Sequence, residues 1–341
     1  MSAAAAFPRA LPGLLYRGLR LQNPWNYKAP ALIAVPYFMI AAGAIPRPAA
    51  FAGILLSLCT IAGIAGVAYF LNDLGDIEKD RLAGRENAVA GLAPWQRALV
   101  LGLALLAALL PWRYLPWTPA SLGLLGAELA LFVAYCFPPL RLKERAFLGL
   151  VADGLYAHAL PAVLAALTFA LLASRPYPHL RPYLVSLGAW QLALGLRNIV
   201  LHQLQDYPRD LLSGTRTAAV QLGEERLASA LRRVVVPFEL AAFAAFTAVV
   251  ALTMPLFPAA YAAFALATWA LVRTGRRRPA PSTLRERLYA YLDDFYADWL
   301  PLVVLGHLVA AIPSFWPLLL GHLLLFRNAF RRWLERRIPR G

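Results

Sequence analysis

Charged residues are scarce in this chain. Only 15% of its 341 residues are Asp, Glu, Lys or Arg, whereas about one quarter of a soluble globular domain is charged. Hydrophobic residues make up 60% of the chain, and they fall in blocks of about 17–22 residues between short basic stretches. This pattern excludes an ordinary soluble domain and predicts a multi-pass integral membrane protein.

Cysteine is almost absent. The two cysteines, Cys59 and Cys136, fall inside predicted spans, where we interpret them as small packing residues and not as a redox pair. Residues 1–28 lack an apolar core with a small-residue cleavage site, so we expect a cytoplasmic or interfacial segment there instead of a signal peptide. We expect a transmembrane domain over 29–326 and a basic tail over 327–341.

The net charge of +15 raises the question of a nucleic-acid partner. The arginines, however, sit in loops between spans, where positive charge orients a membrane protein and contacts anionic lipid. We therefore expect membrane lipid as a partner and no nucleic acid.

The hydrophobic blocks predict an all-α bundle of about nine transmembrane helices. The predicted spans are 29–46, 50–71, 96–112, 117–136, 149–172, 183–204, 235–253, 256–273 and 296–312, followed by a short apolar stretch at 316–326. With the N-terminus in the cytoplasm, the external loops carry only Arg47, Arg113, Arg175 and Arg181. The positive-inside rule therefore places the longer polar loops on the cytoplasmic side of the membrane. We expect this membrane to be the cytoplasmic membrane of a bacterium.

An acidic segment, Asn72–Asp80, directly follows the second span. On a helix Asn72, Asp76 and Asp80 share one face, because they recur every four residues. Asp73 lies beside them. Clustered carboxylates repel one another unless a cation sits among them, and oxygen-only ligands favour Mg²⁺.

A second acidic pair, Asp206 and Asp210, follows the sixth span. Asp76-x3-Asp80-x3-Gly84 aligns with Asp206-x3-Asp210-x3-Gly214. Each segment follows the second span of a four-span block, which predicts two four-helix pseudo-repeats plus a C-terminal element.

Two carboxylate clusters on one side of a membrane can hold two or three Mg²⁺ ions, which complete their shells with substrate phosphate. The pattern therefore predicts a diphosphate substrate whose C–O bond ionises.

The motif Asn72-Asp73-x-x-Asp76-x-x-x-Asp80, together with Asp206-x-x-x-Asp210, resembles the two signature motifs of the UbiA superfamily of intramembrane prenyltransferases. The resemblance implies a helix bundle around a lipid-open cavity. It implies that Asn72, Asp76 and Asp80 bind one Mg²⁺, that Asp206 and Asp210 bind another, and that Asp73 supports the first cluster. These five aspartates are the predicted catalytic residues.

The resemblance extends to a basic stretch after the fourth span, Tyr135–Lys143. It implies that Lys143, and secondarily Arg141, bind the diphosphate. Arg81 and Arg216 are further candidates.

Four residues are predicted to line the substrate cavity: Asp153, Tyr156, Asn198 and His202. Asp153 begins the fifth span, with Tyr156 nearby, and His202 lies one turn before Asp206. An ionisable residue inside a membrane span is costly and marks a functional position.

The predicted activity is Mg²⁺-dependent transfer of a prenyl group from a polyprenyl diphosphate to an aromatic, quinone-precursor or lipid acceptor. Two enzyme alternatives use the same metal site: a membrane terpene cyclase and a phosphoribosyl-type transferase. An ion-coupled transporter is the alternative from another class, but transporter sites lie near the membrane midplane and not at span ends.

Overall fold

The computed structural model describes residues 28–273, 292 and 295–327. Nearly all of the expected N-terminal segment and of the expected basic tail therefore lie outside the described residues. Every regular element in the described part is a helix, which confirms the all-α prediction.

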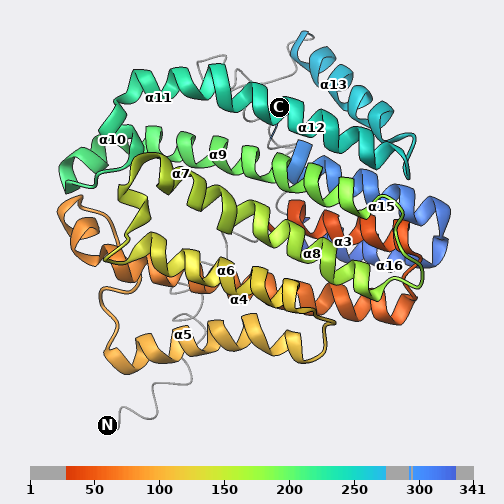
Figure 1. Ribbon diagram of the computed structural model, residues 1–341, viewed down its shortest axis with the longest axis horizontal. Helices are drawn as coiled ribbons and strands as arrows, with labels where there is room; N and C mark the ends of the chain where they lie inside the picture. Colours follow the sequence, from red (N-terminus) through yellow and green to blue (C-terminus); the bar gives the residue numbers. More distant parts are fainter. Residues whose placement is uncertain (1–27, 274–291, 293–294, 328–341) are drawn as a thin grey trace, which may run out of the picture. The chain divides into compact units, whose positions relative to one another are not determined.

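The helices follow the predicted hydrophobic blocks (Figure 1). In chain order the longer ones are α3 (Ala29–Gly43), α4 (Arg47–Leu82), α5 (Pro94–Leu109), α6 (Pro119–Cys136), α7 (Ala146–Gly154), α8 (Leu160–Leu172), α9 (Leu180–Ser213), α12 (Val236–Ala251), α13 (Phe257–Arg273), α15 (Leu300–Ala311) and α16 (Trp316–Leu325). Short elements connect them: η1 (Leu110–Arg113), η2 (Leu142–Glu144), η3 (Leu155–Ala159), α10 (Ala218–Leu222), α11 (Glu224–Ala230), η4 (Leu231–Val235), η5 (Phe295–Trp299) and η6 (Pro313–Phe315).

Two helices extend beyond the spans predicted for them. The second span was expected to end at residue 71 and the sixth at residue 204, but α4 continues to Leu82 and α9 to Ser213. The apolar run marks only the part of each helix that suits the membrane interior. The acidic segments that follow also have a helical period of four, so the helices continue through them.

Six helical segments in the described part are long and apolar enough to cross a membrane, and four shorter helices are apolar as well. The six begin at Arg47, Pro94, Pro119, Ala146, Leu180 and Glu224. These segments agree with a multi-pass integral membrane protein, whereas the number of nine spans stays a prediction.

The chain forms two compact units, which are described separately. Among the described residues, the first unit comprises Cys59–Thr168 and Arg181–Phe246. The second comprises 28–58, Phe169–Leu180 and the described residues after 246.

In the first unit, α4 packs along α5 (Figure 1). Val67 and Phe70 of α4 form one buried cluster with Val100 and Ala104 of α5. The backbones approach so closely that a Cβ on Gly63 would lie 2.2 Å from the Ala108 nitrogen. A glycine is required at this position because any larger residue would separate the two helices.

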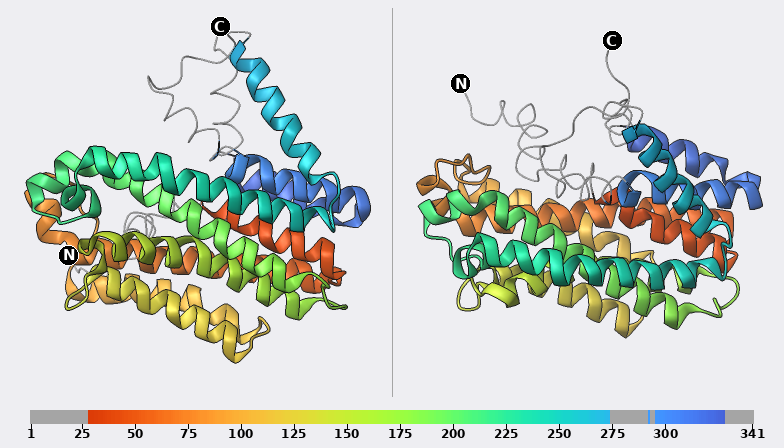
Figure 2. Two further views of the ribbon diagram at one scale, coloured as in Figure 1. Left: turned by 45° about the horizontal axis from the view of Figure 1, so that its top comes forward. Right: turned by 90° about the horizontal axis from the view of Figure 1, so that it is seen from above.

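Helices α9 and α12 run side by side in the same unit, as both figures show (Figures 1 and 2). Trp190 stacks on Phe246 with ring centroids 4.7 Å apart. A fully buried ion pair joins the helices, with Arg197 Nε 2.7 Å from Glu239 Oε2. The buried charge of Glu239 is thus compensated from the neighbouring helix, as an intramembrane carboxylate requires.

In the second unit, α3 packs against α15. The Tyr37 hydroxyl of α3 lies 3.3 Å from Nδ1 of His322 on α16, and Phe51 stacks on Phe315. None of the predicted site residues belongs to this unit, so the candidate site is built entirely from the first.

Candidate active site

The first acidic motif occupies the last turns of α4. The helix ends because Gly84 adopts a left-handed conformation with φ 65°, which glycine reaches without steric cost. The Arg85 N–H then donates to the Asp80 carbonyl at 2.8 Å. The chain therefore turns back directly after the motif and keeps the next residues beside it.

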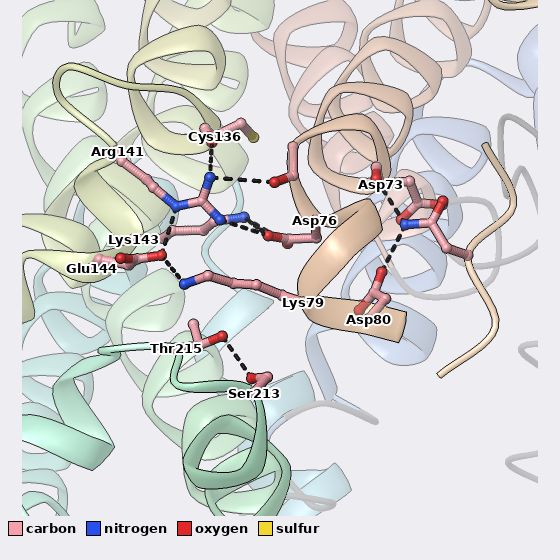
Figure 3. A network of polar contacts seen from close by, with 12 residues as sticks. Asp73, Asp76, Lys79, Asp80, Cys136, Arg141, Lys143, Glu144, Ser213 and Thr215 are labelled. Carbon is pink, nitrogen blue, oxygen red and sulfur yellow. Dashed lines mark hydrogen bonds and ion pairs between the residues drawn. The ribbon is translucent and has the colours of Figure 1, made fainter. Parts of the chain in front are cut away.

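Asp76 is bound by two cations from the loop after α6. Lys143 Nζ lies 2.5 Å from each of its carboxylate oxygens, and Arg141 Nη2 lies 3.0 Å from Oδ1. Figure 3 shows both side chains turned toward Asp76. The structure thus brings together the acidic residue and the two basic residues that the sequence pattern predicted for one site.

This basic loop is held by further contacts. Arg141 donates from Nη1 to the carbonyl oxygens of Gly75 and Cys136, at 3.2 and 3.3 Å. Its Nε donates to Glu144 at 2.6 Å, and Lys79 also donates to Glu144 (Figure 3). Partial burial acts to raise the pKa of the Glu144 carboxyl, but the hydrogen bonds from Lys79 and Arg141 outweigh it and lower that pKa.

A glycine fixes the position of the loop on α7. A Cβ on Gly149 would lie 2.5 Å from the Leu142 carbonyl oxygen, so the loop rests directly on the helix backbone. Lys143 is consequently buried, with only 6% of its side chain exposed. A desolvated ammonium group interacts more strongly with anions than one in water does.

Asp80 has a different partner. The Asn87 side chain donates from Nδ2 to Asp80 Oδ2 at 2.8 Å and to the Asp73 carbonyl at 2.7 Å. The Asp73 side chain is buried, with 1% exposure. Figure 3 shows Asp80 turned away from the lysine and arginine that bind Asp76.

The second motif lies at the end of α9, and both its carboxylates are buried. Asp206 lies 3.2 Å from Arg85 Nη1, 3.4 Å from Arg209 Nη1 and 3.5 Å from His202 Nε2. Asp210 accepts from the Thr217 hydroxyl at 3.0 Å.

The contact between Arg85 and Asp206 joins the two motifs. Arg85 follows the first motif in the chain, yet its side chain pairs with the first aspartate of the second motif. The two acidic helix ends, which the internal repeat relates in sequence, therefore lie in the same unit and are connected by this ion pair.

The predicted cavity residues fall in two places. Tyr156 lies in the π-helical turn η3 and donates to Asp153 Oδ2 at 2.6 Å. Its ring contacts Phe132 and Tyr135 of α6, with centroids 4.3 and 5.2 Å away. Such π-helical turns are common at functional sites because they shift side chains out of the regular α-helical positions.

The other two predicted cavity residues lie on α9. His202 is 64% exposed and faces Asp206. Asn198 is half-buried one turn earlier, and Asn72 is half-buried on α4.

Two predicted basic residues are not brought to Asp76. Arg81 is 70% exposed and pairs with Glu78 on its own helix, Nη2 to Oε1, at 2.5 Å. Arg216 is exposed, and its backbone carbonyl accepts from Gln221. A role for either in binding diphosphate stays a prediction.

Sequence reasoning missed five residues of this site: Lys79, Arg85, Asn87, Glu144 and Thr217. One signal was available for two of them. Extending the alignment of the repeats beyond Gly84 and Gly214 places Asn87 opposite Thr217, and both can donate a hydrogen bond. Ion pairs such as Lys79–Glu144 depend on how a loop folds back, which no local pattern reveals.

Comparison with known proteins identifies the class. The family model of the UbiA prenyltransferase family matches residues 29–293, so the chain belongs to that family. It is an integral membrane protein of the prenyltransferase class.

Individual relatives agree with this assignment. The chain is 32% identical to a lycopene elongase/hydratase from Haloarcula japonica over 218 residues, which is 60% of this chain and 67% of the relative. Two structures of a UbiA homologue from Archaeoglobus fulgidus have the same fold. The homologue bound to GPP and Mg²⁺ has a TM-score of 0.54 and 18% identity, and the one bound to DMAPP and Mg²⁺ has 0.55 and 16%. Each covers 85% of this chain and 99% of its own.

Proposed function

We propose that this enzyme transfers a prenyl group from a prenyl diphosphate to a lipophilic acceptor, with Mg²⁺ and the diphosphate held between the two acidic helix ends. One observation carries the proposal. Two repeat-related acidic motifs are linked by the Arg85–Asp206 ion pair, and a buried lysine and an arginine contact the first of them. Carboxylates beside desolvated cations suit a metal diphosphate, which carries charges of both signs.

The donor set fits Mg²⁺. In the described part of the chain no three His, Cys, Asp or Glu side chains form a metal-binding group, but Mg²⁺ does not need one. It commonly binds through one or two carboxylates and takes its other oxygens from water and substrate phosphate. Asp76 and Asp80, with Asn72, would hold one ion, and Asp206 and Asp210 another. The ligands of the Archaeoglobus homologue, GPP or DMAPP with Mg²⁺, support this choice of metal and substrate.

The chain's own residues would then promote ionisation of the substrate. Bound Mg²⁺ supplies positive charge to the diphosphate. Lys143 and Arg141 move from Asp76 to the diphosphate oxygens and neutralise the charge that grows as the bond between C1 and oxygen breaks. Diphosphate leaves with the electron pair, the acceptor forms a bond to C1, and the acceptor loses a proton. The faces of Phe132, Tyr135 and Tyr156 stabilise the allylic cation.

The proposal is tested by Asp76→Asn and Asp206→Asn in purified protein. We expect Mg²⁺-dependent release of diphosphate from geranylgeranyl diphosphate to be lost in both variants. The melting temperature without Mg²⁺ should stay near that of the unsubstituted protein in Asp206→Asn, whose partners are largely exposed, and should fall in Asp76→Asn, which leaves the buried Lys143 without its carboxylate. Undiminished release in either variant would contradict the proposal. A cyclised hydrocarbon formed without acceptor would instead identify the cyclase alternative.

We further propose that the acceptor is a lipid and not an aromatic acid. The named activity of the Haloarcula relative concerns lycopene, an apolar polyene. An alkene that attacks the prenyl cation must afterwards lose a proton or gain water. Asp153, which already accepts a hydrogen bond from Tyr156 beside the aromatic cluster, is the base we assign to this step.

Asp153→Asn distinguishes release of diphosphate from the later loss of a proton by the prenylated acceptor. We expect diphosphate release to continue, because the metal site is unchanged, whereas the yield of prenylated lipid falls by about 10²-fold. Asp153→Glu is the matched control, because it keeps a carboxylate that can accept the proton and should retain most of the product. Equal loss of release and product in Asp153→Asn would refute the assigned role.

We also propose that the site faces the cytoplasm of a bacterial cell. After Cys59 and Cys136 are replaced by alanine, single cysteines at Leu212 and Leu256, which are 75% and 74% exposed, can report the orientation. A membrane-impermeant maleimide should label Leu256→Cys in intact cells and Leu212→Cys only after permeabilisation. The reverse pattern would invert the topology.

A further inference from the structure

The second aspartates of the two motifs, Asp80 and Asp210, share a feature that the signature motifs do not include. Each accepts a side-chain hydrogen bond at Oδ2 from the residue seven positions later, Asn87 at 2.8 Å and Thr217 at 3.0 Å. The donors differ chemically, but they occupy equivalent positions in the repeat.

The same backbone turn creates both contacts. Gly84 and Gly214 have φ values of 65° and 66°. The following N–H groups, of Arg85 and Thr215, donate to the carbonyls of Asp80 and Asp210 at 2.8 and 2.9 Å. This left-handed cap reverses the chain after each helix and returns the donor to the carboxylate. A chance contact would not repeat together with its supporting turn.

Both donors are themselves fixed. Asn87 Oδ1 accepts from the N–H groups of Val89 and Ala90, each at 3.0 Å, while its amide also reaches the Asp73 carbonyl. Thr217 is buried, with 7% exposure. A carboxylate held by such a donor keeps a single orientation, which lowers the cost of ordering it when a ligand binds.

The neutrality of the donors is informative. Asp76 and Asp206 have cationic partners, which compete with a metal ion for the same oxygens. An amide or a hydroxyl orients a carboxylate without adding a formal positive charge, so Asp80 and Asp210 keep a negative charge that can attract a cation.

We propose that Asn87 and Thr217 are positioning residues that orient Asp80 and Asp210 for Mg²⁺. The inference rests on the proposed function, because it assigns the two aspartates to the metal. Loss of such a supporting hydrogen bond typically lowers metal affinity by about 10–100-fold.

The decisive variant is Thr217→Val, which preserves shape and removes the hydroxyl. The measurement is the Mg²⁺ concentration at the midpoint of the rise in melting temperature, with inorganic diphosphate present. We expect this midpoint to increase about 10–100-fold in Thr217→Val and to return toward that of the unsubstituted protein in Thr217→Ser. Diphosphate release should recover in Thr217→Val at high Mg²⁺, which a merely structural defect would not allow.

Ser213→Ala is the matched control. Its hydroxyl lies in the same turn but contacts Thr215 Oγ1 at 2.8 Å and the Asp210 carbonyl at 3.3 Å, and not the carboxylate. Its midpoint should stay unchanged. Asn87→Ala should shift the midpoint in the same direction as Thr217→Val, and it decides the outcome if Thr217→Val does not purify.

A folded Thr217→Val protein with an unchanged midpoint overturns this inference alone, provided that the unsubstituted protein responds to Mg²⁺. If the unsubstituted protein shows neither the rise in melting temperature nor diphosphate release, the proposed function fails and this inference fails with it.

Discussion

The first aspartates of the two repeats, Asp76 and Asp206, have unequal surroundings. Asp76 contacts Lys143 and Arg141, whose side chains are 6% and 19% exposed. Asp206 contacts Arg85, Arg209 and His202, whose side chains are 37%, 58% and 64% exposed. The second aspartates, in contrast, have matching neutral donors. Among the described residues, both helix ends therefore hold an aspartate with a neutral hydrogen-bond donor, whereas the buried lysine and the half-buried arginine lie at the first helix end.

Exposure decides what the lysine and arginine side chains among these contribute. A charge pair in water gains little, because solvent screens it, whereas a desolvated pair interacts strongly. The asymmetry predicts that the two ends of the site respond differently to the same type of substitution.

The largest difference is expected between Lys143→Ala and Arg209→Ala. Loss of a buried cation that faces the developing charge should lower the rate of diphosphate release by about 10²–10³-fold. Loss of the exposed Arg209 should change it by less than about fivefold. Single-turnover kinetics on both variants at saturating Mg²⁺ measures this difference, and similar losses in the two would abolish the asymmetry.

A smaller effect is expected from moving the basic loop without changing its charges. In Gly149→Ala the new Cβ would meet the Leu142 carbonyl oxygen at 2.5 Å, so the loop must shift, at a cost of about 1–3 kcal/mol. Thermal unfolding in detergent should show the loss. Gly126→Ala is the control, because nothing lies within 4 Å of its new Cβ, and a comparable loss there would show that the glycine contact is unimportant.

The smallest effect concerns pH. The folded-state pKa of Glu144 lies below the ordinary value of 4.5. Its contacts with Lys79 and Arg141 therefore stabilise the fold fully above that value and are lost as the pH falls through the lower, folded-state pKa. The melting temperature of the protein should exceed that of Glu144→Gln near neutral pH, and the difference should shrink in acid. A difference that grows in acid would contradict the lowered pKa.

Much of this architecture could be predicted from sequence. The hydrophobic blocks located the helices because a membrane imposes length and apolarity on them. The period of four aligned Asn72, Asp76 and Asp80, and the repeat pointed to Asp206 and Asp210. Lys143 contacts Asp76, whereas its role in binding diphosphate stays a prediction.

The remaining features depend on tertiary structure. Arg81 is adjacent to Asp80 in the chain, yet on the helix it faces outward and pairs with Glu78. Arg85, four residues further, reaches Asp206 because the Gly84 turn redirects the chain. Position in the sequence therefore did not reveal the partner of either arginine, and the role of Arg81 in binding diphosphate stays a prediction.

The continuation of α4 through its acidic motif restricts how this segment can change in length. Each residue of an α-helix rotates the next by about 100°. One inserted or deleted residue between Asp76 and Asp80 would therefore turn Asp80 about a quarter of a circle away, and no side-chain rotation could restore the face that the two share. Alleles that change the length of this segment should therefore be null.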